Sequence, residues 1–195
     1  MGKFSFEEVN ELYVDVLREI GNIGSGNATT AIASMLDLRL NMNVPKVELL
    51  SFQEFGSAIS AEDETIVGIY LGLEQDIEGS MMFLMKLDSA HYLVNRLMGR
   101  DPDYKEDFTE MDLSAIKEIG NIIAGSYLSA LSSMTNLTIS PTIPYVAIDM
   151  AAAYGDNALL IETQFGDEVM IEGYFILLPE LDSYDKILSA LGIAI

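Results

Sequence analysis

The sequence predicts an α+β fold, internally duplicated, in which helices pack on a largely antiparallel sheet shared by two pseudo-two-fold-related halves. Three observations predict it. The pentapeptide Glu-Ile-Gly-Asn-Ile occurs at residues 19–23 and again at 118–122. Three strand-like segments follow each copy without an intervening helix, and each half then ends in a short helical segment. A doubly wound parallel sheet is disfavoured, because parallel neighbours need crossover connections, usually helices, between consecutive strands.

The pentapeptide belongs to a longer repeated element. Each copy reads (D/S)-x3-E-x2-N-x22-P, and the two copies are displaced by 99 residues. The first element consists of Asp15, Glu19, Asn22 and Pro45, and the second consists of Ser114, Glu118, Asn121 and Pro144. Because the same residue types recur at the same spacing, we predict one domain over residues 1–195, built of two repeats at about 5–99 and 105–193.

Both halves have the same predicted order of elements: a motif helix, three strands and a short helix. The strands are expected at residues 46–55, 65–73 and 78–87, and at residues 145–153, 158–165 and 168–178. The offset between the repeats falls from 99 to 94, because residues 77–79 match residues 171–173. We therefore predict a shorter hairpin between the first two strands of the second half.

Capping signals mark the start of each predicted helix. Ser5 and Glu8 form a capping-box pattern before the first motif helix, and Thr109 and Asp112 stand at the start of the second. The short helices are expected to begin at the N-cap residues Asp88 and Asp182 and to end at Gly99 and near Gly192.

The motif helices are amphipathic. At 100° per residue, one polar stripe holds Glu8, Glu11, Asp15, Glu19 and Asn22, and the other holds Glu110, Ser114, Glu118 and Asn121. The apolar faces are expected to point into the core, with Ile20 and Ile23 on the first helix and Met111, Ala115, Ile119 and Ile122 on the second. A single polar stripe is most simply a solvated face. Its recurrence with the same Glu and Asn favours a functional surface.

Glycines accompany both pentapeptides: Gly21, Gly24 and Gly26 in the first half, and Gly120 and Gly125 in the second. Because glycine destabilises a helix interior, close helix packing is the expected reason for them. A phosphate-cradling loop is disfavoured, since it requires a glycine-rich turn after a strand and usually a lysine.

Composition restricts the classes of partner. The formal net charge is -21 and no basic cluster is present, which disfavours nucleic acid and anionic membranes as ligands. A lysine-presenting protein partner is favoured electrostatically, although acidity also serves solubility alone. The chain has no cysteine, no apolar run of membrane-spanning length and no leader-like N-terminus. We therefore expect a cytoplasmic protein without disulfides.

Common hydrolytic sites are hard to build from this chain. His91 is the single histidine, no Gly-x-Ser-x-Gly motif is present, and His or Cys ligands for zinc are lacking. A glycosidase-type carboxylate pair is disfavoured because asparagine stands where the second carboxylate belongs. A side-chain amide can orient a water for attack on a phosphoryl group, and a glutamate one turn away can pair with a lysine.

The two elements resemble the signature of the CheC, CheX and FliY phosphatases of bacterial and archaeal chemotaxis, and two elements in one chain resemble the CheC type. The resemblance covers nearly the whole chain. A CheX-like unit carries one motif and acts as a dimer, whereas FliY carries a further C-terminal domain, which we do not expect in a sequence that ends at Ile195.

The resemblance implies dephosphorylation of the aspartyl phosphate on a CheY-type response regulator. The chain would have no cofactor of its own, because the phosphorylated receiver domain would supply Mg²⁺. Asn22 and Asn121 would position the attacking water, and Glu19 and Glu118 would pair with the receiver's lysine. Supporting roles fall to the remaining motif residues, with Asp15 and Ser114 in docking and Pro45 and Pro144 in shaping the turn into a strand.

The family also implies a second partner, the receptor deamidase CheD. Two other functions remain open at this point. One is a non-catalytic adaptor that uses the same helix faces only to bind a receiver or CheD. The other is a carboxylate-only hydrolase that acts on a small substrate in a pocket between acidic residues. Whether both motifs are active is also open.

Overall fold

The computed structural model describes residues 11–37, 39, 41–42, 46–51, 65–149, 157–166 and 170–192. The helices in these ranges are α1 (Glu11–Leu36), α3 (Leu87–Leu97), α4 (Glu110–Thr135) and α5 (Leu181–Ala190). The strands are β1 (Asn41–Met42), β2 (Lys46–Ser51), β3 (Ile66–Gln75), β4 (Gly79–Lys86), β5 (Ile139–Pro141), β6 (Tyr145–Asp149), β7 (Asn157–Gly166) and β8 (Met170–Pro179). Each predicted strand corresponds to one of these.

The strands form one sheet in which every recorded pair is antiparallel. Its order is β1-β7-β8-β4-β3-β5, with β2 also on β7 and β6 also on β3. β4 and β8 meet at the centre, where Phe83 pairs with Phe175. The α+β class and the antiparallel sheet are therefore confirmed. If β1, β2, β3 and β4 are exchanged with β5, β6, β7 and β8, respectively, the same strand order is obtained in reverse. This symmetry agrees with a duplication, although the duplication itself stays a prediction.

The first strand of each half pairs with the second strand of the other half. β2 lies on β7, with Leu49 opposite Leu159, and β6 lies on β3, with Val146 opposite Ile69. The predicted hairpin between the first two strands of a half is therefore wrong, because β4 occupies one edge of β3 and β5 and β6 occupy the other. The pairing of β2 with β7 and of β6 with β3 therefore helps to join the two halves into one sheet.

Two local predictions also need correction, whereas the match between residues 77–79 and 171–173 agrees with the strand register. Gly79 lies opposite Pro179 and Gly173 lies opposite Met85, and a shift of 94 residues carries one pair onto the other, so both glycines occupy corresponding places in the β4–β8 pair. Asp88 and Asp182 are not N-caps. The strands run directly into the short helices, whose N-cap residues are Lys86 and Glu180, and both aspartates lie in the first helical turn. The predicted ends are correct, since Gly99 and Gly192 adopt positive φ angles just after the helices.

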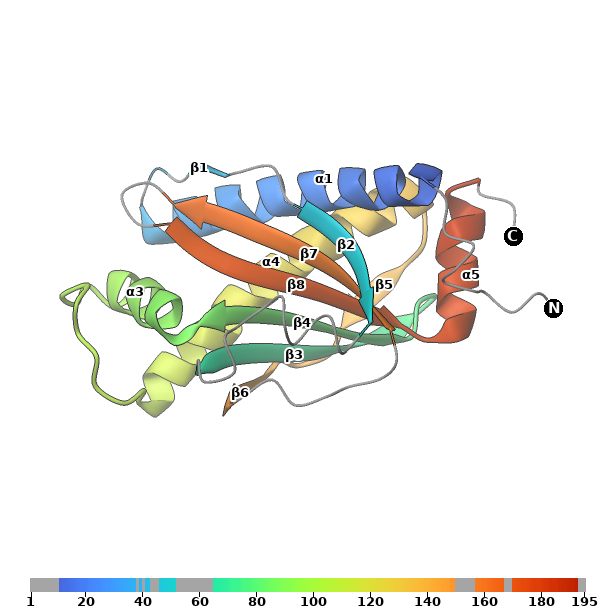
Figure 1. Cartoon of the computed structure of the whole chain (residues 1–195). Coiled ribbons are helices and arrows are strands. Elements are labelled where there is room, and N and C mark those ends of the chain that lie inside the picture. The colour runs from blue at the N-terminus through green and yellow to red at the C-terminus, as the bar shows by residue number, and fades with distance from the viewer. Residues whose placement is uncertain are drawn as a thin grey trace.

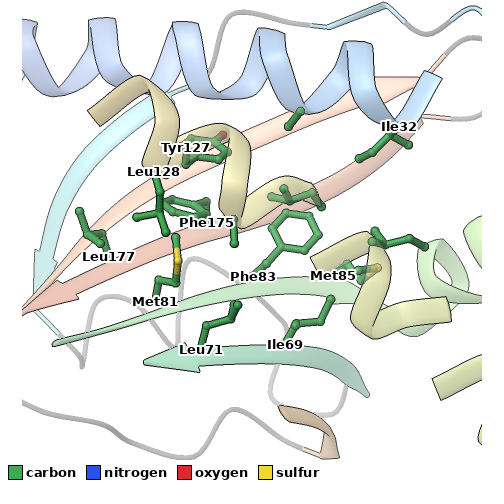
Figure 2. Packing of buried hydrophobic residues seen from close by; sticks show 14 of the residues in the cluster. Ile32, Ile69, Leu71, Met81, Phe83, Met85, Tyr127, Leu128, Phe175 and Leu177 are labelled. Carbon is green, nitrogen blue, oxygen red and sulfur yellow. The ribbon is translucent and has the colours of Figure 1, made fainter. Parts of the chain in front are cut away.

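The core lies between the sheet and the helix pair α1 and α4. Figure 1 shows these two long helices on the same face of the sheet, running in opposite directions, with α3 and α5 at opposite ends. Ile32 of α1, Ile116 of α4 and Met81 of β4 are almost fully buried in this core. In Figure 2, Tyr127 of α4 lies against Phe175 of β8, with ring centroids 3.9 Å apart.

The opposite face of the sheet is also apolar. A second buried cluster contains Ile66, Met82, Leu84, Tyr174 and Ile176. Residues 81–85 of β4 are consecutively buried, which is the pattern of a strand covered on both faces. The central strands therefore form a rigid base for α1 and α4.

Candidate functional site

The structure places the motif side chains on the outer surfaces of α1 and α4. Glu19 and Glu118 are exposed, Asn22 is half-buried and Asn121 is exposed. Because the helices run in opposite directions, their N-terminal halves, which carry the motifs, lie toward opposite ends of the molecule (Figure 1). The two polar stripes therefore form two separate faces, each borne by one helix.

The other motif positions are arranged around these faces. Asp15 and Ser114 are exposed, one helical turn before the motif glutamates. Pro144 is buried directly before β6. Its fixed φ suits the entry into an edge strand. Pro45, Ser5 and Glu8 lie outside the described residues.

The inner face of each pentapeptide packs closely. A Cβ on Gly24 would lie 2.5 Å from the Tyr127 ring of α4, and a Cβ on Gly120 would lie 2.4 Å from Ile69 of β3. Gly24 thus confirms the expected close helix contact, while Gly120 is required by a strand. The same prediction is wrong for Gly26 and Gly125, since a Cβ on either would meet nothing within 4 Å.

Two apolar motif neighbours are more exposed than predicted. Ile20 and Ile119 are buried in the core, and Ile122 is partly buried against it, as expected. Ile23 is 36% exposed and Met111 is 66% exposed, so their assignment to the core is wrong. Both lie at the margin of the apolar arc, where helical periodicity does not decide burial.

A capping box fixes the start of α4, as predicted. The Thr109 hydroxyl accepts a hydrogen bond from the Asp112 amide, and the Asp112 carboxylate accepts one from the Thr109 amide at 2.9 Å. Asp112 is only 1% exposed and lies 2.8 Å from an Arg100 guanidinium nitrogen. Burial alone raises the pKa of a carboxyl, but hydrogen bonds from Arg100 and Thr109 outweigh it and hold the Asp112 pKa below its ordinary value.

The connector before α4 is held by further contacts. Lys105 pairs with Asp88 at 2.6 Å, and the Asn95 amide donates to the Tyr104 carbonyl at 2.8 Å. His91 is buried and stacks on Phe108, with ring centroids 4.3 Å apart, and its burial lowers the pKa of the imidazole. His91 therefore has a packing role here. Together these contacts orient the helix that carries the second motif.

Sequence reasoning missed a basic residue next to each motif glutamate. Arg18 pairs with Asp15 at 2.5 Å, and both side chains are largely exposed. The counterpart of Arg18 is Lys117, which is exposed and forms no ion pair with a described residue, because Ser114 stands in the place of Asp15. The signal was available, since a cation precedes the glutamate in both copies.

The described part of the chain holds neither a metal-binding cluster nor a membrane-spanning helix. It contains no group of three or more His, Cys, Asp or Glu side chains that could hold a metal ion. None of its helices has the length and apolarity needed to cross a bilayer. The groups that each face offers for chemistry are therefore an exposed carboxylate and an exposed or half-buried amide, both on a helix.

Comparison with solved structures supports the fold. FliY of Thermotoga maritima superposes with a TM-score of 0.78 at 20% identity, covering 95% of this chain and 98% of that chain. CheX of Borrelia burgdorferi, solved in a complex with CheY, BeF3 and Mg, superposes with a TM-score of 0.53 at 22% identity, covering 80% and 96% of the chains. At these identities, the likeness shows a common fold.

Sequence comparison identifies the family. The model of the CheC-like family matches residues 14–49 and 111–148, which include both motif elements from the first position to the proline. The flagellar motor switch phosphatase FliY of Bacillus subtilis is 24% identical over 84% of this chain, which covers 44% of that protein. The CheY-P phosphatase CheC of Bacillus subtilis is 36% identical, covering 96% of this chain and 97% of that protein. The chain belongs to the CheC-like family.

Proposed function

We propose that this protein is a phosphatase that hydrolyses the aspartyl phosphate of a CheY-type response regulator in chemotaxis signalling. The observation that carries the proposal is the outward placement of one glutamate and one asparagine on each of two helices whose inner faces are buried in the core. No contact within the described chain explains why these two identities recur. Its relative in Bacillus subtilis is named for this activity.

Asn22 and Asn121 are the proposed catalytic residues. An amide does not titrate, and it offers an acceptor and two donors that can hold a water in line with the phosphorus. A rigid helix suits this role, because catalysis by positioning is sensitive to displacements of about 1 Å. We propose that the receiver supplies Mg²⁺, which neutralises the phosphoryl oxygens while the chain contributes the oriented water.

Glu19 and Glu118 are proposed to pair with a lysine of the receiver. Both carboxylates are exposed one helical turn from the asparagine, and therefore lie on the same surface. An ion pair of this kind fixes the register and orientation of the receiver on the helix more than it contributes to affinity. We assign Asp15 and Ser114 to docking, and Pro45 and Pro144 to the turns that lead into β2 and β6.

The proposal extends to a second partner and a location. By resemblance, the receptor deamidase CheD is proposed to bind and modulate the protein. A cytoplasmic location is proposed with it, and the absence of cysteine agrees with a reducing compartment. A non-catalytic adaptor remains the second candidate function, because an exposed acidic face serves binding without chemistry.

The proposal is tested by phosphate release from a phosphorylated CheY-type receiver in the presence of Mg²⁺. We expect the wild type to accelerate release and each of Asn22→Ala and Asn121→Ala to retain only the activity of the other helix. Acetyl phosphate without receiver is the control substrate. Acceleration of acetyl phosphate hydrolysis alone would favour a carboxylate-only hydrolase and contradict the proposal.

A further inference from the structure

A glycine lies one helical turn after each motif asparagine. Gly26 follows Asn22 by four residues, and Gly125 follows Asn121 by four. Gly125 is exposed and Gly26 is half-buried. The structural reason that applies to Gly24 and Gly120 does not apply to them, since a Cβ at either position would have nothing within 4 Å.

No backbone requirement explains these two glycines. Both lie well inside helices of 26 residues, and neither has the positive φ that marks a helix end or a turn. A glycine in a helix interior is destabilising relative to alanine. Each half therefore carries a destabilising residue for which the described part of the chain shows no packing or conformational reason.

Both glycines lie on the functional stripe. Counted at about 100° per residue, Gly26 falls between Glu19 and Asn22 around the helix axis. Thr30, the next exposed residue along this face, donates its hydroxyl to the Gly26 carbonyl at 2.9 Å and so folds back onto the helix. Main chain and not a side chain therefore forms the surface at Gly26 itself.

We propose that the phosphorylated receiver contacts the motif helices at Gly26 and Gly125, where its surface approaches the helix main chain more closely than a Cβ would permit. The inference rests on the proposed function. An amide that must reach a phosphoryl group within a partner's pocket needs the helix to approach closely. A methyl group at this position needs about 3.5–4.0 Å to the nearest carbon atom, and it would hold the helix and its asparagine away.

The test compares two effects of replacing the glycine by alanine: the substitution should stabilise the protein and at the same time weaken its interaction with the receiver. Gly125→Ala in the Asn22→Ala background should raise Tm by about 2–4 °C through helix propensity. The same substitution should lower kcat/KM for the phosphorylated receiver at least tenfold. Gly26→Ala in the Asn121→Ala background should behave in the same way. Because the asparagine backgrounds leave binding by the other helix in place, the double variant Gly26→Ala/Gly125→Ala is used for affinity, and it should raise the Kd for a receiver carrying beryllofluoride and Mg²⁺ at least tenfold.

Ser133→Ala is the matched control. Ser133 is exposed on α4 two turns beyond Gly125, and its replacement favours helix without adding an atom to the surface. We expect it to leave Kd unchanged. An unchanged Kd in the double variant Gly26→Ala/Gly125→Ala would overturn the inference. If the wild type binds the receiver without hydrolysing its phosphate, the phosphatase proposal fails, while the Kd comparison still decides the role of the glycines.

Discussion

The substitution Gly120→Ala tests how the core positions the second motif. Gly120 stands between Glu118 and Asn121 and faces β3. An added Cβ would lie 2.4 Å from the Ile69 Cγ2 atom and 2.9 Å from its Cδ1 atom. Carbon atoms in contact prefer about 3.5–4.0 Å, so α4 or β3 must move by roughly 1 Å. The movement would occur at the turn that carries the motif.

Two opposing terms set the expected magnitude. Overpacking of a filled core costs about 1–3 kcal/mol, and this contact is short enough for the upper half of that range. Alanine recovers about 1 kcal/mol of helix propensity. We therefore expect the free energy of unfolding to fall by about 1–2 kcal/mol, and Tm to fall by about 2–8 °C in a chain of this size.

The assay is urea and thermal denaturation followed by circular dichroism. Gly125→Ala is the matched control, because it makes the same substitution on the same helix in open space and should stabilise. Ile69→Ala removes the clashing atoms, so it should cost less in the Gly120→Ala background than in the wild type. A Gly120→Ala protein as stable as Gly125→Ala would refute the packing argument, as would additive effects of the Gly120 and Ile69 substitutions.

Three further predictions concern α4 and its surroundings. Thr109→Ala removes the N-cap hydroxyl and should lower the unfolding free energy by about 1 kcal/mol in urea, whereas Thr109→Ser should retain most of it. Burial lowers the pKa of His91 in the folded protein, so as pH falls the His91 imidazole is protonated at a higher pH in the unfolded chain than in the folded protein. The unfolding free energy relative to His91→Phe should therefore be constant above about pH 6.5 and decrease below it until the folded pKa is reached; a pH-independent difference would contradict this. Ser114→Asp adds a carboxylate at the proposed docking position of α4, and in the Asn22→Ala background it should lower KM for the lysine-presenting receiver about two- to fivefold with kcat unchanged; an unchanged KM would count against docking at Ser114.

Local patterns in the sequence predicted the features that depend on neighbouring residues. The Thr109 capping box and the exposed Glu118 and Asn121 follow from spacing along one helix, and the structure shows all of them. The strand segments were also found, because alternating apolar runs between turns are local signals. The roles of the motif residues remain predictions, since they concern a partner and not the chain alone.

The features that were missed depend on contacts distant in sequence. The pairing of β2 with β7 joins residues more than 100 positions apart, and no local pattern states which strands become neighbours. The helix starts were misplaced because β4 and β8 run directly into α3 and α5, leaving Asp88 and Asp182 inside the first turn. Periodicity assigned Met111 to the core, but its exposure depends on where the neighbouring elements end.

The most direct test of the account is the hydrolysis rate of a phosphorylated CheY-type receiver with the double variant Asn22→Ala/Asn121→Ala. Binding of the beryllofluoride-activated receiver is measured on the same preparation. Because both asparagines are on the surface, the variant should fold normally. We predict that it binds the receiver but releases phosphate no faster than the receiver does alone. Release at the wild-type rate would contradict the assignment of catalysis to these residues.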